Sequence, residues 1–376
     1  MKTIGYVTPY NPFEDRIAFS GVIFNVRVAI EKAGFKVIWI PYNSSIKRNI
    51  FEKICNKFFS FIGQSRFTGG LCEKDLKRWA STIDASKIKE CDALFFPANT
   101  QIAIYINTEK PIINLSDATA QQMMGYYWNG FSKKADTEAN RLEIMATKIS
   151  NLFIRPSQWA TDSLIKDCGA EPQKCYVLEY GPCIDKQKII PIQPWQKGRM
   201  NILFSGVDWE RKGGSIAIET TRLLRQNGID AHIFIVGPRK MPKECHKLDF
   251  VTFIGFLDKN NPFDYSRYIE LFKESHIFLL PTRAECAGIV FAEASAFGLP
   301  CYSYNTGGVP NYVIDERNGH LLPTGSTATD FCKCILADIT NSRLEEYHKG
   351  GIELSRTKMS WDVWSEKFAA IVDRIY

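Results

Sequence analysis

Apolar runs typical of β-strands alternate along this chain with segments of helical periodicity. The predicted strands of the first half are Thr3–Val7, Lys36–Ile40, Ala93–Phe96, Ile112–Leu115, Asn151–Arg155 and Val177–Glu179. Those of the second half are Asn201–Ser205, His232–Val236, Val251–Phe253, Ile277–Leu280, Cys301–Tyr304 and His320–Leu322. Because strands separated by helix-length segments form βαβ units, the pattern predicts an α/β protein with two doubly wound, mostly parallel sheets.

A stretch without periodicity separates the two halves. Residues 184–200 contain Pro191, Pro194 and Gly198 and are predicted to be a linker. We therefore expect a first domain over residues 1–183 and a second over residues 201–360. The last segment, residues 361–376, has apolar positions three and four apart, so it is predicted to be an amphipathic helix that buries one face.

Residues 44–80 interrupt the alternation as a long insertion after the second predicted strand. The basic residues in it are Lys47, Arg48, Lys53, Lys57, Arg66, Lys74, Lys77 and Arg78. Three acidic residues leave a net charge of +5 (eight minus three), nearly the whole +6 of the chain. Interleaved with them are Ile46, Ile50, Phe51, Ile54, Phe58, Phe59, Phe61 and Ile62. This pattern fits a basic amphipathic helix on an anionic membrane surface, or a helix whose apolar face packs on its own domain.

Charge and cysteine content narrow the class of protein. A net charge of +6 over 376 residues is too small to imply a nucleic-acid partner. No run of 18 apolar residues predicts a spanning helix, and the first residues read as a strand rather than a signal peptide. The eleven cysteines have irregular spacings, which favours a reduced, cytoplasmic protein. Cys332 and Cys334 have no further ligand at metal-binding spacing, so no metal is predicted.

The segment His276–Pro300 carries the clearest chemistry. A buried strand is followed by a loop and by a helix that begins near Gly288 and ends at Gly298. The backbone amides of Gly288, Ile289 and Val290 are then unpaired at a helix N-terminus, where the helix dipole attracts a phosphate. Without a Cβ atom, Gly288 lets the backbone approach such a group closely.

Two glutamates stand on either side of this predicted phosphate site. Glu293 lies about one and a half turns into the helix, where its carboxylate can accept hydrogen bonds from two ribose hydroxyls. Glu285 precedes it in the loop, beside the expected diphosphate and toward the sugar end of a nucleotide sugar. Two glutamates at this spacing on their own also fit a solvated helix face.

These residues resemble the donor-binding region of glycosyltransferase family 4, whose members are retaining enzymes. Glu285 and Glu293 match its two-glutamate motif with seven residues between them, and the Gly307–Pro310 turn also fits. The resemblance implies the GT-B architecture, two Rossmann-like domains facing across a cleft, with the last helix returning to the first domain. It further implies that Glu285 contacts the donor sugar, Glu293 the ribose, and the amides between them, from Ala287 to Val290, the diphosphate.

The turn after the first strand of the second domain supports the resemblance. It contains Gly206, Arg211 and Lys212, and ligands of open α/β sheets bind at the carboxyl ends of strands. Two cations there would stabilise the charge on a departing nucleoside diphosphate, although a solvated pair at a helix start is the plainer alternative. Lys212 matches the family's lysine. The family's arginine position is occupied by Val207, and Arg211 is expected to substitute for it.

The resemblance assigns further contacts with weaker support. Gly255 and Phe256 are expected to read the base edge with backbone groups, or else belong to a core strand. Ser20 and Gly21 occupy the position of a glycine pair that faces the donor. Asp117 follows the fourth strand and is expected to contact the sugar or the acceptor, where one role open to it is that of the base that takes the acceptor proton. An Asx turn or helix cap is the alternative for Asp117.

The function implied is transfer of a sugar, with retention and without metal or other cofactor, from a nucleoside-diphosphate sugar to an acceptor hydroxyl. The acceptor class is a saccharide or lipid-linked saccharide in glycan, polysaccharide or glycolipid synthesis, and the location is cytoplasmic or peripheral on the inner face of a membrane. A GT-B nucleotide-sugar isomerase and a catalytically degenerate binding member are the alternatives. A nicotinamide-dependent oxidoreductase is rejected, because no GxGxxG follows either first strand.

Overall fold

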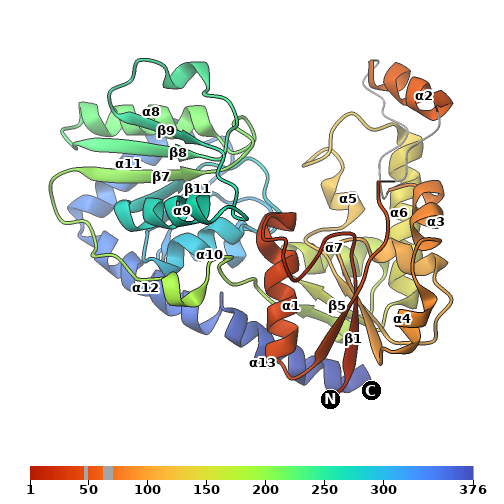
Figure 1. The fold of residues 1–376 in the computed structure, drawn as a ribbon. Coiled ribbons are helices and arrows are strands. Elements are labelled where there is room, and N and C mark those ends of the chain that lie inside the picture. The colour runs from red at the N-terminus through yellow and green to blue at the C-terminus, as the bar shows by residue number, and fades with distance from the viewer. Residues whose placement is uncertain (46–49, 62–70, 376) are drawn as a thin grey trace. The chain divides into compact units, whose positions relative to one another are not determined.

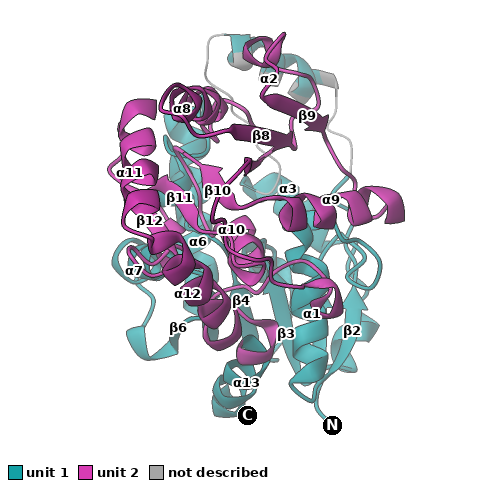
Figure 2. Ribbon diagram, turned by 90° about the vertical axis from the view of Figure 1, so that its left-hand side faces the viewer, with its two compact units in different colours: residues 1–178, 364–376 teal, residues 179–363 magenta. Residues whose placement is uncertain are grey.

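The computed structural model describes residues 1–45, 50–61 and 71–375, and these divide into two compact units. The first contains residues Met1–Leu178 and Trp364–Tyr376, and the second contains Glu179–Val363 (Figure 2). Residues 184–200 belong to the second unit by their contacts: Ile192 N–H donates to Phe297 O at 3.0 Å and Asp185 N–H to the Tyr265 hydroxyl at 2.7 Å.

The first unit is built on a six-stranded parallel sheet of order β2-β1-β3-β4-β5-β6 (Figure 1). Its strands are β1 Thr3–Val7, β2 Lys36–Ile40, β3 Ala93–Pro97, β4 Ile112–Leu115, β5 Leu152–Arg155 and β6 Cys175–Val177. Its helices are α1 Val22–Lys32, α2 Ile50–Phe61, α3 Glu73–Ala80, α4 Ala85–Lys89, α5 Ala120–Met123, α6 Lys133–Ile149, α7 Gln158–Cys168 and α13 Trp361–Val372. Strands β3, β4 and β5 are buried along their whole length, which explains why their sequences are apolar except for Asn114 and Arg155. These two buried polar residues bond each other, the Arg155 guanidinium donating to Asn114 Oδ1 at 3.0 Å.

The second unit repeats this plan, with the sheet order β12-β11-β10-β7-β8-β9. Its strands are β7 Met200–Ser205, β8 Ala231–Val236, β9 Val251–Gly255, β10 Ile277–Leu280, β11 Cys301–Tyr304 and β12 Gly319–Leu322. Its helices are α8 Gly214–Gln226, α9 Pro262–Glu274, α10 Ile289–Ala296, α11 Ala328–Thr340 and α12 Arg343–Thr357. Every strand pair in both sheets is parallel, so the predicted βαβ organisation is confirmed.

One strand prediction was displaced. We expected a strand over Val177–Glu179, whereas β6 covers Cys175–Val177. The reason is the neighbouring strand: Phe153, Ile154 and Arg155 of β5 pair with Cys175, Tyr176 and Val177, and a parallel strand must begin where its partner can bond it. The short apolar run that suggested the later position continues this ladder by only one bond, from Leu178 N–H to Arg155 O.

Helix α13 buries its apolar face as its spacing predicted. Phe368 is fully buried, and its ring lies 5.7 Å from that of Phe35 and 6.0 Å from that of Phe95, both in the first unit. Trp364 stacks on Phe368 at 4.8 Å. These contacts account for the inclusion of residues 364–376 in the first unit.

The two helices of the 44–80 insertion differ in burial. In α3, Leu76 and Trp79 are buried in the core of the first unit, and the carboxylate of Glu73 pairs with Lys77 and Arg141. The expectation that the insertion packs on its own domain is therefore correct for α3. In α2, four large apolar side chains remain exposed.

Residues 46–49 and 62–70 of the insertion, including Lys47, Arg48 and Arg66, lie outside the described residues. Among the described residues, no helix has both the length and the hydropathy to cross a bilayer.

Candidate active site

The order of the second sheet locates the site. From β7 the chain proceeds through β8 to β9 on one side, and from β10 through β11 to β12 on the other, so the order reverses between β7 and β10. Ligands of open α/β sheets bind at the carboxyl ends of strands at such a reversal. The two segments with predicted chemistry, residues 206–213 after β7 and residues 281–288 after β10, meet at this point.

Backbone contacts hold these two loops together. Arg283 N–H donates to Arg211 O at 2.8 Å, and the Arg211 guanidinium donates to Ala284 O at 2.8 Å. Gly213 is required by the approach, because a Cβ atom there would lie 2.1 Å from Pro281 O. Arg211 is thus tied to the Glu285 loop, and its N–H donates to the Asp208 carboxylate at 3.0 Å.

Lys212 and Glu285 form an ion pair at the junction of the loops. Their side chains are only 10% and 12% exposed. Gly206 makes room for Lys212, since a Cβ atom at Gly206 would lie 2.7 Å from Lys212 Cγ. The structure therefore brings together two residues that lie 73 positions apart and that were singled out from separate motifs.

The N-terminus of α10 lies beside this pair. Gly288 is its N-cap with a φ of 93°, and no side chain caps the helix, so its first amides lack the usual acceptor. Ile289 and Val290 are half-buried, whereas Ala287 and Gly288 are buried. Gly308 N–H donates to Glu285 O at 3.0 Å, which connects the Gly307–Pro310 turn to the loop that carries the glutamate. This geometry fits the predicted diphosphate site.

Glu293 is 1% exposed and already bonded on both oxygens. Lys259 Nζ donates to Oε1 at 2.8 Å, and the Tyr268 hydroxyl donates to Oε2 at 2.7 Å. Burial, followed by the charge of Glu293, raises the pKa of Tyr268 well above its ordinary value, so this hydroxyl stays a donor. A ribose that reaches Glu293 must share these oxygens or move the partly exposed Lys259 ammonium aside.

Neither Lys259 nor Tyr268 was predicted from the sequence. Lys259 lies in the loop after β9, and Tyr268 lies on the buried face of α9. The only signal was the position of Lys259 at the carboxyl end of a strand, the edge of the sheet where ligands bind. Tyr268 has no comparable signal, because an aromatic residue on a buried helix face is ordinary core.

The predicted base-edge residues lie at the same edge of the sheet. Gly255 ends β9 with a φ of 83°, and its carbonyl accepts a hydrogen bond from Gly237 N–H at 2.8 Å. Phe256 lies under the guanidinium of Arg239, 4.0 Å from the ring centroid. Their contact with a base stays a prediction.

Ser20, Gly21 and Asp117 belong to the first unit. Phe19, Ser20 and Gly21 have consecutive positive φ values of 49°, 58° and 96°, an uncommon conformation for the two non-glycine residues. Backbone strain of this kind is concentrated at functional sites. Asp117 is partly exposed after β4, and the N-cap of the following helix α5 is Thr119 rather than Asp117. The cap alternative for Asp117 is therefore wrong for this helix.

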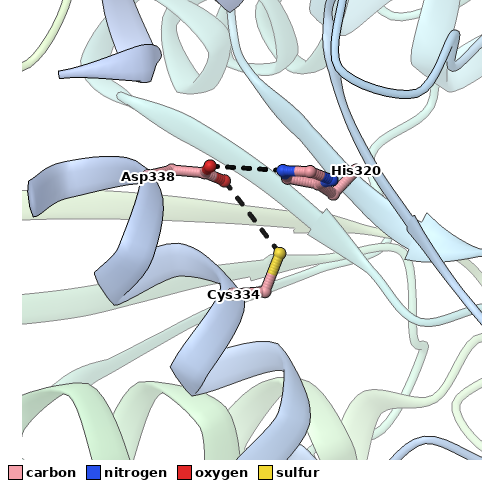
Figure 3. A group of neighbouring side chains, drawn as sticks. All are labelled: His320, Cys334 and Asp338. Atoms are coloured by element: carbon pink, nitrogen blue, oxygen red, sulfur yellow. Dashed lines mark hydrogen bonds and ion pairs between the residues drawn. The ribbon is translucent and has the colours of Figure 1, made fainter. Parts of the chain in front are cut away.

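A side-chain cluster outside the site surrounds Cys334. His320 of β12 and Asp338 of α11 lie beside it, and the three potential ligand atoms are within 4.8 Å of one another (Figure 3). These neighbours of Cys334 were not predicted from the sequence, because His320 is distant in the chain and Asp338 lies one helical turn away. The Asp338 oxygens accept hydrogen bonds from Tyr302 at 2.9 Å and Tyr347 at 3.3 Å. The cluster is thus a hydrogen-bond network that joins β11, β12, α11 and α12.

His320 makes this network pH-dependent. Its Nε2 lies 3.2 Å from Asp338 and its Nδ1 3.1 Å from Asp315, and the Asp338 bond is the largest cause that raises the pKa of His320 above its ordinary value. A raised folded-state pKa adds stability that is complete below the unfolded value of about 6.5 and is lost as the pH rises through the folded value.

We expect His320→Asn to reduce the free energy of unfolding more at pH 6 than at pH 9, measured by urea denaturation. Equal losses at both pH values for His320→Asn would contradict the assignment.

The second unit resembles known proteins in sequence. Residues 185–349, all in the second unit, match the family model described as "Glycosyl transferases group 1". The match supports a glycosyltransferase family. Over 145 residues the chain is 26% identical to D-inositol 3-phosphate glycosyltransferase of Arthrobacter sp. (strain FB24), a segment that covers 37% of this chain and 34% of that protein. The aligned segment thus spans about a third of this relative's length.

Solved structures extend the likeness over both units. Sucrose-phosphate synthase from Thermosynechococcus elongatus superposes with a TM-score of 0.71 at 14% identity, covering 100% of this chain and 99% of the other. Anabaena HepE in complex with UDP-glucose superposes with a TM-score of 0.65 at 13% identity, covering 100% of both chains. At this identity the likeness shows the fold alone. The fold is GT-B, as the sequence analysis expected.

Proposed function

We propose that this protein is a retaining glycosyltransferase of family 4, which moves a sugar from a nucleoside-diphosphate sugar to an acceptor hydroxyl. The observation that carries the proposal is the Lys212–Glu285 ion pair beside the uncapped N-terminus of α10, at the reversal of the second sheet. A helix N-terminus and a lysine attract a diphosphate, and a carboxylate next to them can accept hydrogen bonds from sugar hydroxyls. The family match over residues 185–349 supports the same conclusion.

In this mechanism the bound donor replaces the contact between Lys212 and Glu285. The ammonium of Lys212 turns to the β-phosphate, and Glu285 accepts a hydroxyl of the transferred sugar. The amides of Ile289 and Val290 hold the diphosphate, with Arg211 nearby. These groups stabilise the charge that develops as the bond from the anomeric carbon to the phosphate oxygen breaks, so the proposal needs no metal.

The acceptor oxygen bonds to the same face of the anomeric carbon, and its proton passes to the leaving phosphate oxygen or to Asp117. Retention follows because bond formation and bond cleavage share one face. Exclusion of water would limit hydrolysis of the donor. The acceptor we propose is a saccharide or lipid-linked saccharide, used in the cytoplasm or on the inner face of a membrane.

Two alternatives share the donor site. A nucleotide-sugar isomerase would convert the donor without an added acceptor. A degenerate binding member, suggested by Val207 and by the single glycine at Ser20–Gly21, would bind the donor without turnover. Product analysis with and without acceptors separates both from a transferase.

The first experiment is a thermal-shift screen of UDP, GDP, ADP and CMP and their sugar conjugates, with and without divalent metal. A ligand that binds only the folded state raises the melting temperature, so one selective nucleoside diphosphate is expected to stand out. HepE binds UDP-glucose, which makes UDP the first compound to test. No response to any of these compounds would contradict the donor site.

Glu293→Ala provides the matching test of the ribose contact. Loss of two hydrogen bonds to a charged group should weaken binding of the selected nucleotide by about 1–3 kcal/mol, measured by calorimetry. Because Glu293 is buried, its replacement can also destabilise the fold, so the melting temperature of the variant is measured in parallel. The variant Glu346→Ala, at an exposed position, serves as the control. Unchanged affinity would move the ribose site elsewhere.

A further inference from the structure

Helix α2, labelled in Figure 1, carries a stripe of apolar side chains that are exposed to solvent among the described residues. The exposed fractions are 72% for Phe51, 63% for Ile54, 62% for Phe58 and 90% for Phe61. These residues are three, four and three positions apart, so they share one face of the helix. Scattered apolar residues are normal on a protein surface, but four large ones on a single helix face indicate an interaction site.

The neighbouring helix of the same insertion shows that the exposure is specific to α2. In α3, the apolar residues Leu76 and Trp79 are buried in the core of the first unit. The basic Lys77 of α3 is paired with Glu73. The apolar side chains of α3 are thus explained by their burial in the core of the first unit, whereas the apolar face of α2 has no such explanation.

Charge indicates which partner covers the stripe. Lys53 and Lys57 are exposed on α2 and lie one turn apart, along one flank of the stripe. Lys57 is one turn from both Ile54 and Phe61, so its ammonium can extend from the edge of the apolar face while its stem lies along it. The insertion as a whole has a net charge of +5 (eight basic, three acidic residues). A cationic flank beside an aromatic and aliphatic stripe is complementary to a bilayer with anionic head groups.

We propose that α2 docks in the plane of an anionic membrane surface. Phe51, Ile54, Phe58 and Phe61 enter the boundary between head groups and acyl chains, and Lys53 and Lys57 lie against lipid phosphates. This docking is independent of the sugar donor and of the chemistry proposed above. It would hold the enzyme at the surface where a lipid-linked acceptor resides.

The test is co-sedimentation of the full chain with vesicles of phosphatidylcholine alone or with about a quarter phosphatidylglycerol. The parent protein is expected to bind the anionic vesicles and to be released by salt. The variant Phe51→Ser/Ile54→Ser/Phe58→Ser/Phe61→Ser should reduce the partition coefficient at least about 100-fold. Lys53→Gln/Lys57→Gln should reduce it on the order of tenfold.

Matched controls separate the stripe from general effects. Phe263→Ser removes a phenylalanine that is 84% exposed on α9, and Lys133→Gln/Lys134→Gln removes two exposed charges from α6. Both controls should bind like the parent. Because the replaced α2 side chains are exposed, the melting temperature should be unchanged, which confirms that the variants fold.

Three outcomes would overturn the proposal. The first is a parent protein that does not bind the anionic vesicles, and the second is equal binding to neutral vesicles. The third is binding that the α2 variants and the controls reduce equally. A concentration-dependent dimer that dissociates in the stripe variant, without vesicle binding, would assign the stripe to a second copy of the chain instead.

Discussion

Glu285→Gln is expected to lower kcat by about two to three orders of magnitude with the selected donor and an acceptor. The substitution keeps the shape of the side chain but removes the charge that pairs with Lys212, in a position where both groups are about one-tenth exposed. Lys212→Met should lower kcat by a similar factor, because the leaving diphosphate then lacks the lysine cation. Steady-state kinetics checks both, with the exposed Glu346→Gln and Lys333→Met as charge-matched controls.

The double variant distinguishes catalysis from support of the fold. Each single substitution leaves a nearly buried charge without its partner and should also lower the melting temperature. The double variant Lys212→Met/Glu285→Gln removes both charges and should regain stability while its kcat stays low. Recovery of activity together with stability would mean that the pair is only structural.

Gly288→Ala is expected to weaken binding of the nucleoside diphosphate by at least tenfold. At a φ of 93°, a Cβ atom would lie 2.9 Å from the Phe291 ring and at the N-terminus that is proposed to hold the phosphates. The left-handed conformation alone should lower the free energy of unfolding by about 1 kcal/mol, and the close contact should lower it by about a further 1–3 kcal/mol. Calorimetry measures the affinity, and urea denaturation measures the stability.

Gly325→Ala is the matched control for this substitution. Gly325 has nearly the same φ, 95°, but its Cβ atom would meet nothing within 4 Å. We therefore expect Gly325→Ala to lose only the conformational part of the stability and to bind the nucleotide like the parent. Parent-like affinity in Gly288→Ala would show that the phosphates lie elsewhere.

The strands and the βαβ organisation were predictable because their signal is local. Ile277–Leu280 is a continuous apolar run and Cys301–Tyr304 is apolar except for Ser303; turn residues follow each, and the structure has both strands at these residues. The start of α10 was also predictable from the sequence, since Gly288 and the loop before it lie next to the helix in the chain. A prediction failed where a neighbour decides the register, as in β6 beside β5.

The sequence by itself determined the two sheets, the α10 N-terminus and the residue types of the candidate site. Only the tertiary structure decided which of those residues meet: Lys212 with Glu285, Glu293 with Lys259 and Tyr268, and Cys334 with His320. It also separated α2 from α3, two helices of one basic and apolar insertion that differ in burial. The physical reason is the range of the interactions. Periodicity and turn chemistry act over a few residues, whereas ion pairs and burial depend on the order of strands and on which faces of distant elements pack together.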